Sequence, residues 1–167
     1  MAAEANTKSA AVTALGCEWP MIEALMGGTG QMRDAGEAML PKWPNEATES
    51  WTARKDTATL FPAYRRTISV MAGKPFSKAL TFGDDVPEAI IGWADDIDRE
   101  GVNLHVFAAE MFAESFYGLA GILVEAPRLA DTGRVQTRAD QVSAGIRPYF
   151  VRVMHGQILG FRTEVQN

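Results

Sequence analysis

The stretch from Gly27 to Leu80, GGTGQMRDAGEAMLPKWPNEATESWTARKDTATLFPAYRRTISVMAGKPFSKAL, decides the fold of this chain. From Thr48 onward its apolar residues recur at helical spacing, which predicts a helix of about two dozen residues that ends at Gly73. Pro62 lacks a backbone donor and clashes with the preceding helical turn. We therefore expect either a kink or a break into two helices near residues 58–61.

The residues before this helix predict an extended N-terminal arm. Residues 1–45 are rich in Ala, Gly, Met and Pro, and the one helical pattern is short, from Met21 to Met26. Prolines at 41 and 44 bracket Trp43 and hold their neighbours in extended conformations, so this piece reads as a stiff connector. We interpret residues 1–45 as the arm, with one or two helical turns, and residues 46–167 as the main domain.

The remaining patterns predict an α+β domain in which helices pack on a small mixed or antiparallel sheet. A second helix is expected from Pro87 to Ile97, and a third starts at the capping residue Asn103 and is apolar enough to be sandwiched. Residues 119–126 read as a buried strand, and Thr137 with Asp140 as the capping box of a short helix. Residues 147–154 and 159–165 read as two further strands.

These motifs, taken in order, resemble a portal-like protein family of tailed-phage heads. Its members begin with a "GGT..MR.AG..LP..P.E" segment, followed by a helix of the type "Y..R...A.LFNA..RT...L.G..F.K". The later blocks "YG..GILVE.P" at 117–127 and "RPY" at 147–149 are similar to the family in the same order. The residues that match the helix pattern are Trp51, Arg54, Ala58, Leu60, Phe61, Arg66, Thr67, Gly73, Phe76 and Lys78.

The resemblance covers residues 20–165 and implies a role in virion architecture. In that family, identical subunits form a ring at one vertex of the capsid, through which a packaging motor drives the genome. Because portal-like proteins continue for hundreds of residues, we expect this chain, with its final strand followed by Asn167, to be a truncated portal wing domain. The resemblance implies that its partners are further copies of the chain and the capsid, terminase and tail proteins of the phage.

Composition and charge are those of a globular protein with banded polarity. The chain has 167 residues, 47% hydrophobic and 22% charged, and a net charge of −5. Residues 51–80 carry 6 basic and 1 acidic groups, whereas residues 81–126 carry 1 and 10. Such bands are either solvated faces or complementary patches that join identical subunits. No apolar run is long enough for a membrane span, so we expect no membrane partner.

A basic group is the candidate site. Duplex DNA attracts cations without a sequence code, so these side chains could contact non-specific double-stranded DNA. The alternatives are contact with the acidic 81–126 stretch of another subunit and a solvated helix face. The members of the group are Arg54, Lys55, Arg65, Arg66, Lys74 and Lys78.

The motifs of catalytic, metal and cofactor sites are incomplete in this sequence. Asp96, Asp98 and Glu100 match the first positions of a calcium loop, but its twelfth position holds Phe107. We expect a helix-end loop there, with Asp95, Asp96 and Asp98 left open only as ligands of an adventitious cation. The glycines at 27–30 and Gly73 lack the rest of a phosphate-binding loop, and Cys17 and the two histidines lack catalytic partners. The expectation is no enzyme, no cofactor and no metal.

The function expected from the sequence is a structural component of a phage or prophage head. The chain would be a portal-like ring subunit at the vertex through which DNA passes, located in the virion and, during assembly, in the cytoplasm of the bacterial host. The alternative is a small, non-enzymatic prophage protein that binds a partner and stays monomeric.

Overall fold

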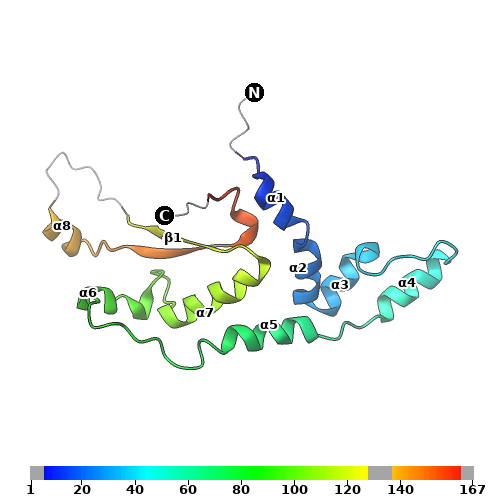
Figure 1. The fold of residues 1–167 in the computed structure, drawn as a ribbon, viewed down its shortest axis with the longest axis horizontal. Coiled ribbons are helices and arrows are strands. Elements are labelled where there is room, and N and C mark those ends of the chain that lie inside the picture. Colours follow the sequence, from blue (N-terminus) through cyan, green and yellow to red (C-terminus); the bar gives the residue numbers. More distant parts are fainter. Residues whose placement is uncertain (1–5, 128–136, 163–167) are drawn as a thin grey trace, which may run out of the picture.

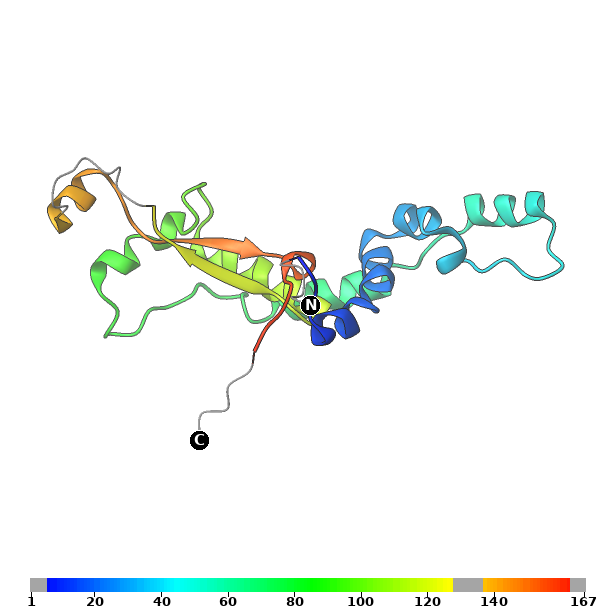
Figure 2. The same cartoon turned by 90° about the horizontal axis from the view of Figure 1, so that it is seen from above.

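The computed structural model describes residues 6–127 and 137–162, which form a mostly helical chain with a small two-stranded antiparallel sheet. The α+β class predicted from the sequence is thereby confirmed. Figures 1 and 2 show an elongated body, with α6 and α8 at one end and α4 at the other. The sheet lies along one side of α7, and α5 lies along the opposite side (Figure 1).

The elements are short. The α-helices are α1 (Ala10–Gly16), α2 (Trp19–Gly27), α3 (Thr29–Asp34), α4 (Thr48–Thr57), α5 (Ala63–Gly73), α6 (Glu88–Ile91), α7 (Leu104–Glu114) and α8 (Arg138–Ser143). Single 3₁₀ turns are η1 (Gly36–Ala38), η2 (Ala94–Asp96), η3 (Ser115–Tyr117) and η4 (His155–Gln157). The strands are β1 (Gly121–Glu125) and β2 (Tyr149–Val153).

The extended N-terminal arm predicted for residues 1–45 is wrong for residues 10–38, which are largely helical. The predicted piece at 21–26 lies inside α2, but α1 and α3 flank it, and Ser9 caps α1 by accepting from the N–H of Val12. Val12 is fully buried, and the indole of Trp19 donates to the carbonyl of Tyr117 at 3.0 Å. The N-terminal helices dock because these long-range contacts bury apolar side chains that local patterns leave unpaired.

The break expected at Pro62 is confirmed, since α4 ends at Thr57 and α5 starts at Ala63. The N-terminal helices complete the connection between them. Arg33 donates through Nε and Nη2 to the carbonyl of Ala58 at 2.9 and 2.8 Å. The N–H of Leu60 donates to Thr29 Oγ1 at 3.1 Å. These bonds satisfy backbone groups that the broken helix leaves without intrahelical partners.

The third predicted helix is confirmed as α7, whereas the second is shorter than predicted. Asn103 caps α7, because its side chain accepts from the N–H of Val106 at 2.9 Å. The expected helix over 87–97 becomes the single turn α6 and the 3₁₀ turn η2, with Gly92 between them. Few of its apolar residues find cover, since Ile90 and Ile91 stay exposed.

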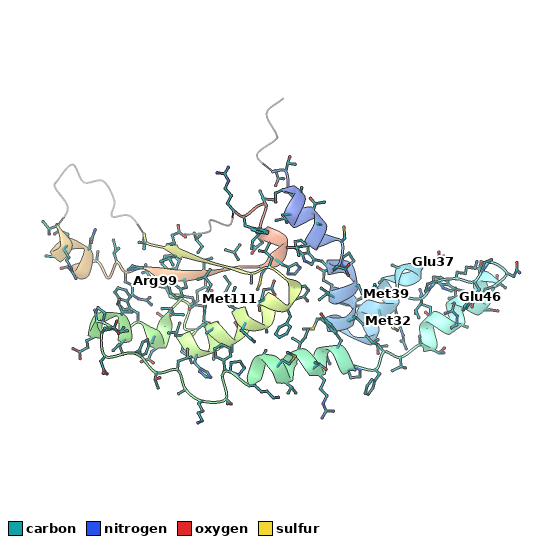
Figure 3. The ribbon with its side chains drawn as sticks, viewed as in Figure 1. Met32, Glu37, Met39, Glu46, Arg99 and Met111 are labelled. Atoms are coloured by element: carbon teal, nitrogen blue, oxygen red, sulfur yellow. The ribbon has the colours of Figure 1, made fainter. Side chains whose placement is uncertain are left out.

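The hydrophobic core lies between α7, η2 and β2. Ile97, Phe107 and Met111 are buried together, and Phe150 from β2 packs on Phe107 with ring centroids 5.7 Å apart. Figure 3 shows Met111 on α7 beside the sheet. Because α5 contacts α7 as well, the predicted sandwiching of this helix is confirmed.

The sheet is held against α7 by polar contacts as well as by Phe150. Arg152 on β2 forms an ion pair with Glu110 of α7. The N–H of Phe150 donates to the carbonyl of Ile97 at 3.0 Å, which ties the outer edge of β2 to the loop after η2. Both contacts fix β2 to α7 and η2, and β1 follows through its pairing with β2.

The strand predicted at 119–126 is confirmed as β1, but the prediction that this strand is buried is wrong. Ile122, Leu123 and Val124 are 50%, 51% and 60% exposed, because α7 packs under β2 and no described element covers β1. Val124 pairs with Phe150, whose N–H points away from β1. In an antiparallel pair the N–H and C=O of Val124, and of Ile122 two residues earlier, must then point away from β2. No described residue bonds these groups, so the outer edge of β1 is open.

The last two predicted elements have opposite outcomes. The capping box of α8 is confirmed, since the N–H of Thr137 donates to Asp140 Oδ2 at 2.8 Å and the N–H of Asp140 donates to Thr137 Oγ1 at 3.3 Å. The strand predicted for residues 159–165 is wrong as far as residue 162, which carries no regular structure, and residues 163–165 lie outside the described ranges. Within the described part, β2 is followed by η4 instead of another strand.

The core makes one stability prediction. We expect Phe107→Ala to lower the free energy of unfolding by about 3–5 kcal/mol, because it empties the centre of the buried cluster. Urea unfolding followed by circular dichroism measures the change. Phe61→Ala is the matched control: this side chain is 81% exposed, so its loss should change stability by less than about 0.5 kcal/mol. Equal losses in the two variants would contradict the position of the core.

Candidate interaction surface

The structure divides the six predicted basic residues between two helices. Arg54 and Lys55 lie on α4, whereas Arg65 and Arg66 lie on α5, and Lys74 and Lys78 follow α5. Arg54 and Lys55 are engaged inside the chain. The other four are exposed, and we call them the basic ridge.

Arg54 makes structural contacts at the end of the molecule that contains α4, which we call the projecting end. Its Nε and Nη2 donate to the two carboxylate oxygens of Glu46 at 2.9 and 2.8 Å, and Nη2 also donates to the carbonyl of Pro41 at 2.9 Å. The hydrogen bond from Arg54 lowers the pKa of Glu46, and the same bond raises the pKa of Arg54. Figure 3 shows Glu46 next to α4 at this end of the molecule. This guanidinium therefore closes the loop before α4 and is poorly placed to bind DNA.

Lys55 is also occupied by local contacts. Its ammonium group lies 5.3 Å from the ring centroid of Trp51 and 3.9 Å from Asp56 Oδ1. The indole of Trp51 in turn donates to the carbonyl of Leu40 at 2.9 Å. These contacts fasten α4 to the Pro-rich connector, which the sequence predicted as a stiff piece before this helix.

Arg66 and Lys74 of the basic ridge lie on the outer side of α5, with Arg65 at its flank, and Lys78 lies beyond the end of the helix. The opposite side of the helix carries Ile68 and Ala72, which are buried against the body. The ridge members form no ion pair with any carboxylate of the described residues. Of the six basic residues predicted from the sequence, only the four of the basic ridge are exposed and without an ion pair in the described chain.

Exposed apolar side chains accompany the ridge and continue along the molecule. Val70 and Met71 on α5 are 50% and 51% exposed, and Trp43 near α4 is 70% exposed. An isolated exposed apolar residue is ordinary in a monomer, but a run of them along one side marks an interaction surface. Members near α5 and α6 are Phe61, Val70, Met71, Leu80, Phe82, Ile90 and Ile91.

The acidic band separates into exposed carboxylates and carboxylates used by the fold. Asp96 pairs with Arg147, whose Nη2 lies 2.9 Å from Asp96 Oδ2, and its Oδ1 accepts from the N–H of Gly101. Six others are exposed without an ion pair in the described chain, and we call the four of them between residues 84 and 95 the acidic segment. Its members are Asp84, Asp85, Glu88 and Asp95.

The loop that resembles the start of a calcium site is closed by its own backbone. Oδ1 of Asp98 accepts the N–H groups of Glu100 at 2.9 Å and Val102 at 3.0 Å. Burial alone would raise the pKa of Asp98, but these two N–H groups outweigh it and place the pKa below its ordinary value. Among the described residues no three potential ligands gather around one point. Asp98 therefore shapes the helix-end loop that the sequence predicted.

Sequence reasoning missed a cluster around His155, which follows β2. Its Nδ1 lies 2.6 Å from Glu114 Oε1, and its Nε2 lies 3.4 Å from Glu23 Oε1. The ring stacks on Tyr117 at 4.0 Å and meets Trp19 edge-on at 4.7 Å. Burial, with help from both carboxylates, raises the pKa of Tyr117. The cluster joins α2, α7 and the end of β2, and its members are too far apart in sequence for a local motif to reveal it.

A depression lies beside this cluster. It measures about 550 Å³ and carries the carboxylates of Glu23 and Asp34 with the ring of Tyr117. A second depression of about 380 Å³ lies along β2 near Asp98 and Arg152. Neither brings a nucleophile and a base together with donors aimed at a reacting atom, which is the arrangement that catalysis of group transfer requires.

Comparison with models of known protein families and with curated proteins gives no match. In the described part of the chain, every helix is too short or too polar to cross a bilayer.

The Asp98 loop predicts an acid-sensitive contribution to stability. At neutral pH, Asp98→Ala should lower the free energy of unfolding by about 1–3 kcal/mol, because two buried N–H groups lose their acceptor. The folded-state pKa lies below the unfolded one, so this contribution is present above about pH 4 and disappears as the pH falls through the folded value. Urea titrations at neutral and acid pH should show the difference between wild type and variant shrinking. Asp95→Ala, an exposed neighbour, is the control.

From the His155 cluster we predict that loss of one carboxylate weakens the docking of α2 on the rest of the molecule. Glu114→Ala removes the acceptor of both the backbone N–H and the Nδ1 of His155, and its side chain is only 14% exposed. We expect a loss of about 1–3 kcal/mol, with faster amide hydrogen exchange in α2. Glu23→Ala, at the longer contact and 56% exposed, should change α2 far less. Unchanged exchange in the Glu114 variant would contradict the proposed role of the cluster in docking α2.

Proposed function

We propose that the protein is a structural subunit that assembles with copies of itself, as a portal-like ring component of a phage or prophage head. The supporting sequence feature is the ordered series of portal-like motifs between residues 20 and 165. In this role the chain provides a channel wall and docking faces for the other head proteins, and it makes and breaks no covalent bond.

The observation that carries the proposal is the poor cover of apolar surface on an elongated body. The accessible surface of the chain is 12403 Å², against about 8,000 Å² for a compact monomer of 18.2 kDa. Side chains such as Phe61, Ile90 and Val124 remain in solvent although they would be buried in a compact core. Subunits of obligate assemblies have this character, because their neighbours supply the missing cover.

The proposal also accounts for the placement of charge. The basic ridge and the acidic segment are both unpaired within the described chain, and they occupy different positions along the body. A solitary protein gains nothing from keeping such groups apart, whereas identical subunits in contact can match them. The alternative of a monomeric prophage protein leaves both the exposed apolar surface and the charge separation without a partner.

Measurement of mass in solution tests the proposal. Multi-angle light scattering after gel filtration should give a mass several times the 18.2 kDa of one chain, and negative-stain images of that fraction should show closed rings. A mass of one chain at every concentration used would reject the ring and favour the monomeric alternative. A variant such as Phe107→Ala, which weakens folding, controls for particles formed by unfolded protein.

A further inference from the structure

The outer side of α5 combines positive charge with apolar contact area. Arg66, Val70 and Lys74 are spaced four residues apart, so they lie in line on one face of the helix, with Arg65 beside them. Val70 lies between Arg66 and Lys74 in this line and is 50% exposed, and Met71, the next residue, is 51% exposed. A partner for this face therefore needs carboxylates at its margins and apolar groups at its centre.

The acidic segment has the complementary composition. Asp84, Asp85 and Glu88 are exposed around the start of α6, and the next two apolar residues, Ile90 and Ile91, are 42% and 39% exposed. Residues 79–98 contain no lysine or arginine. No basic residue within this stretch of sequence therefore neutralises the carboxylates of the acidic segment.

The surface beside the acidic segment is hollowed. A depression of about 290 Å³ is lined by Leu80, Phe82, Asp95 and His105, among others. Nδ1 of His105 is buried without a hydrogen-bond partner in the described chain, which is uncommon for a buried polar atom. An arginine or lysine fits this hollow, because its aliphatic stem suits the apolar wall while its charged head can reach the carboxylate of Asp95.

We propose that the basic ridge of one copy docks on the acidic segment of a second copy, with the exposed apolar residues of α5 and α6 packed between them. This inference rests on the self-assembly proposed above. Duplex DNA would match the ridge alone and would leave the acidic segment and its hollow without a partner. A second copy matches both surfaces, and charge complementarity sets the register of the contact.

The positions of the two surfaces suit a head-to-tail contact. In both Figure 1 and Figure 2, α6 lies near one end of the long axis and α5 lies nearer the middle. A contact that joins different patches leaves one ridge and one acidic segment free at the ends of each pair. Further copies then add until the series closes into a ring.

Charge reversal with rescue tests the inference. One variant carries Arg65→Glu, Arg66→Glu and Lys74→Glu, and the other carries Asp84→Lys, Asp85→Lys and Glu88→Lys. All six residues are exposed and without ion pairs in the described chain, so folding should survive both sets of changes. Glu18, Asp34 and Glu37, exposed on the N-terminal helices, are changed to lysine as the matched control.

We expect each reversed variant alone to associate at least about tenfold more weakly than wild type, because like charges then face each other. An equimolar mixture of the two should recover assembly, since every contact between unlike variants again joins opposite charges. The lysine control should assemble as wild type does. Association of the wild type should weaken between about 0.05 M and about 1 M salt, because the contact is screened. Sedimentation velocity measures all five samples: wild type, the two reversed variants, their mixture and the lysine control.

The outcomes separate the inference from the proposed ring. If both reversed variants assemble as wild type does, or if their mixture stays dissociated, the docking contact is wrong even though rings form. If wild type gives only closed dimers that the variants break and the mixture restores, the contact stands and the ring is wrong. If reversal of the ridge abolishes retention of a fluorescent DNA duplex and leaves assembly unchanged, the ridge binds DNA and the contact is rejected.

Discussion

The packing of α7 against the sheet is the constraint on which the rest of this structure depends. Phe107 and Met111 on one face of α7 meet Ile97 and Phe150, and these four side chains form the core cluster between the helix and the sheet. The ion pair between Arg152 and Glu110 and the backbone bond to Ile97 then fix the sheet over the helix. Polar contacts at the periphery add to this core. They are the hydrogen bonds of Arg33 at the break between α4 and α5, the Arg54–Glu46 pair beside α4, and the His155 cluster at the N-terminal helices.

This architecture distributes stability unevenly along the chain and leaves large surfaces uncovered. Polar contacts near solvent contribute modestly to the free energy of folding, so the projecting end around α4, where no described residue is buried, depends on weak interactions. The regions that remain uncovered are those rich in unpaired charge and exposed apolar groups, along α5 and α6. The architectural role proposed above would cover this exposed apolar surface with neighbouring subunits.

Local signals in the sequence predicted the local structure well. Asn103 as a helix cap, Pro62 as a helix breaker and the pair Thr137 and Asp140 all act within a few residues, and each does in the structure what its chemistry requires. The basic group was identified by residue type, but its division could not be foreseen. Whether a cation is free depends on which carboxylate the fold brings to it, as Glu46 is brought to Arg54.

Predictions that depended on distant residues failed or were not possible. The helices at the N-terminus look weak in isolation, and Trp19 is buried by Tyr117, which is almost a hundred residues away. The run at 121–125 is apolar, but sequence cannot say whether a second layer covers a strand, and here no described element does. The His155 cluster likewise combines residues from three separate elements, so no spacing rule could have found it.

The open edge of β1 has a consequence for how this protein can meet anything else. The N–H and C=O groups of Ile122 and Val124 point outward and are satisfied by water, which is adequate while the edge stays wet. Any surface that dries this edge must replace the lost water with a matching alternation of acceptors and donors, as another extended backbone does. A flat apolar surface would bind this edge poorly, although the exposed side chains of β1 are apolar, because it offers no hydrogen-bonding groups. The backbone geometry of the strand, more than its side chains, therefore selects the binding partner.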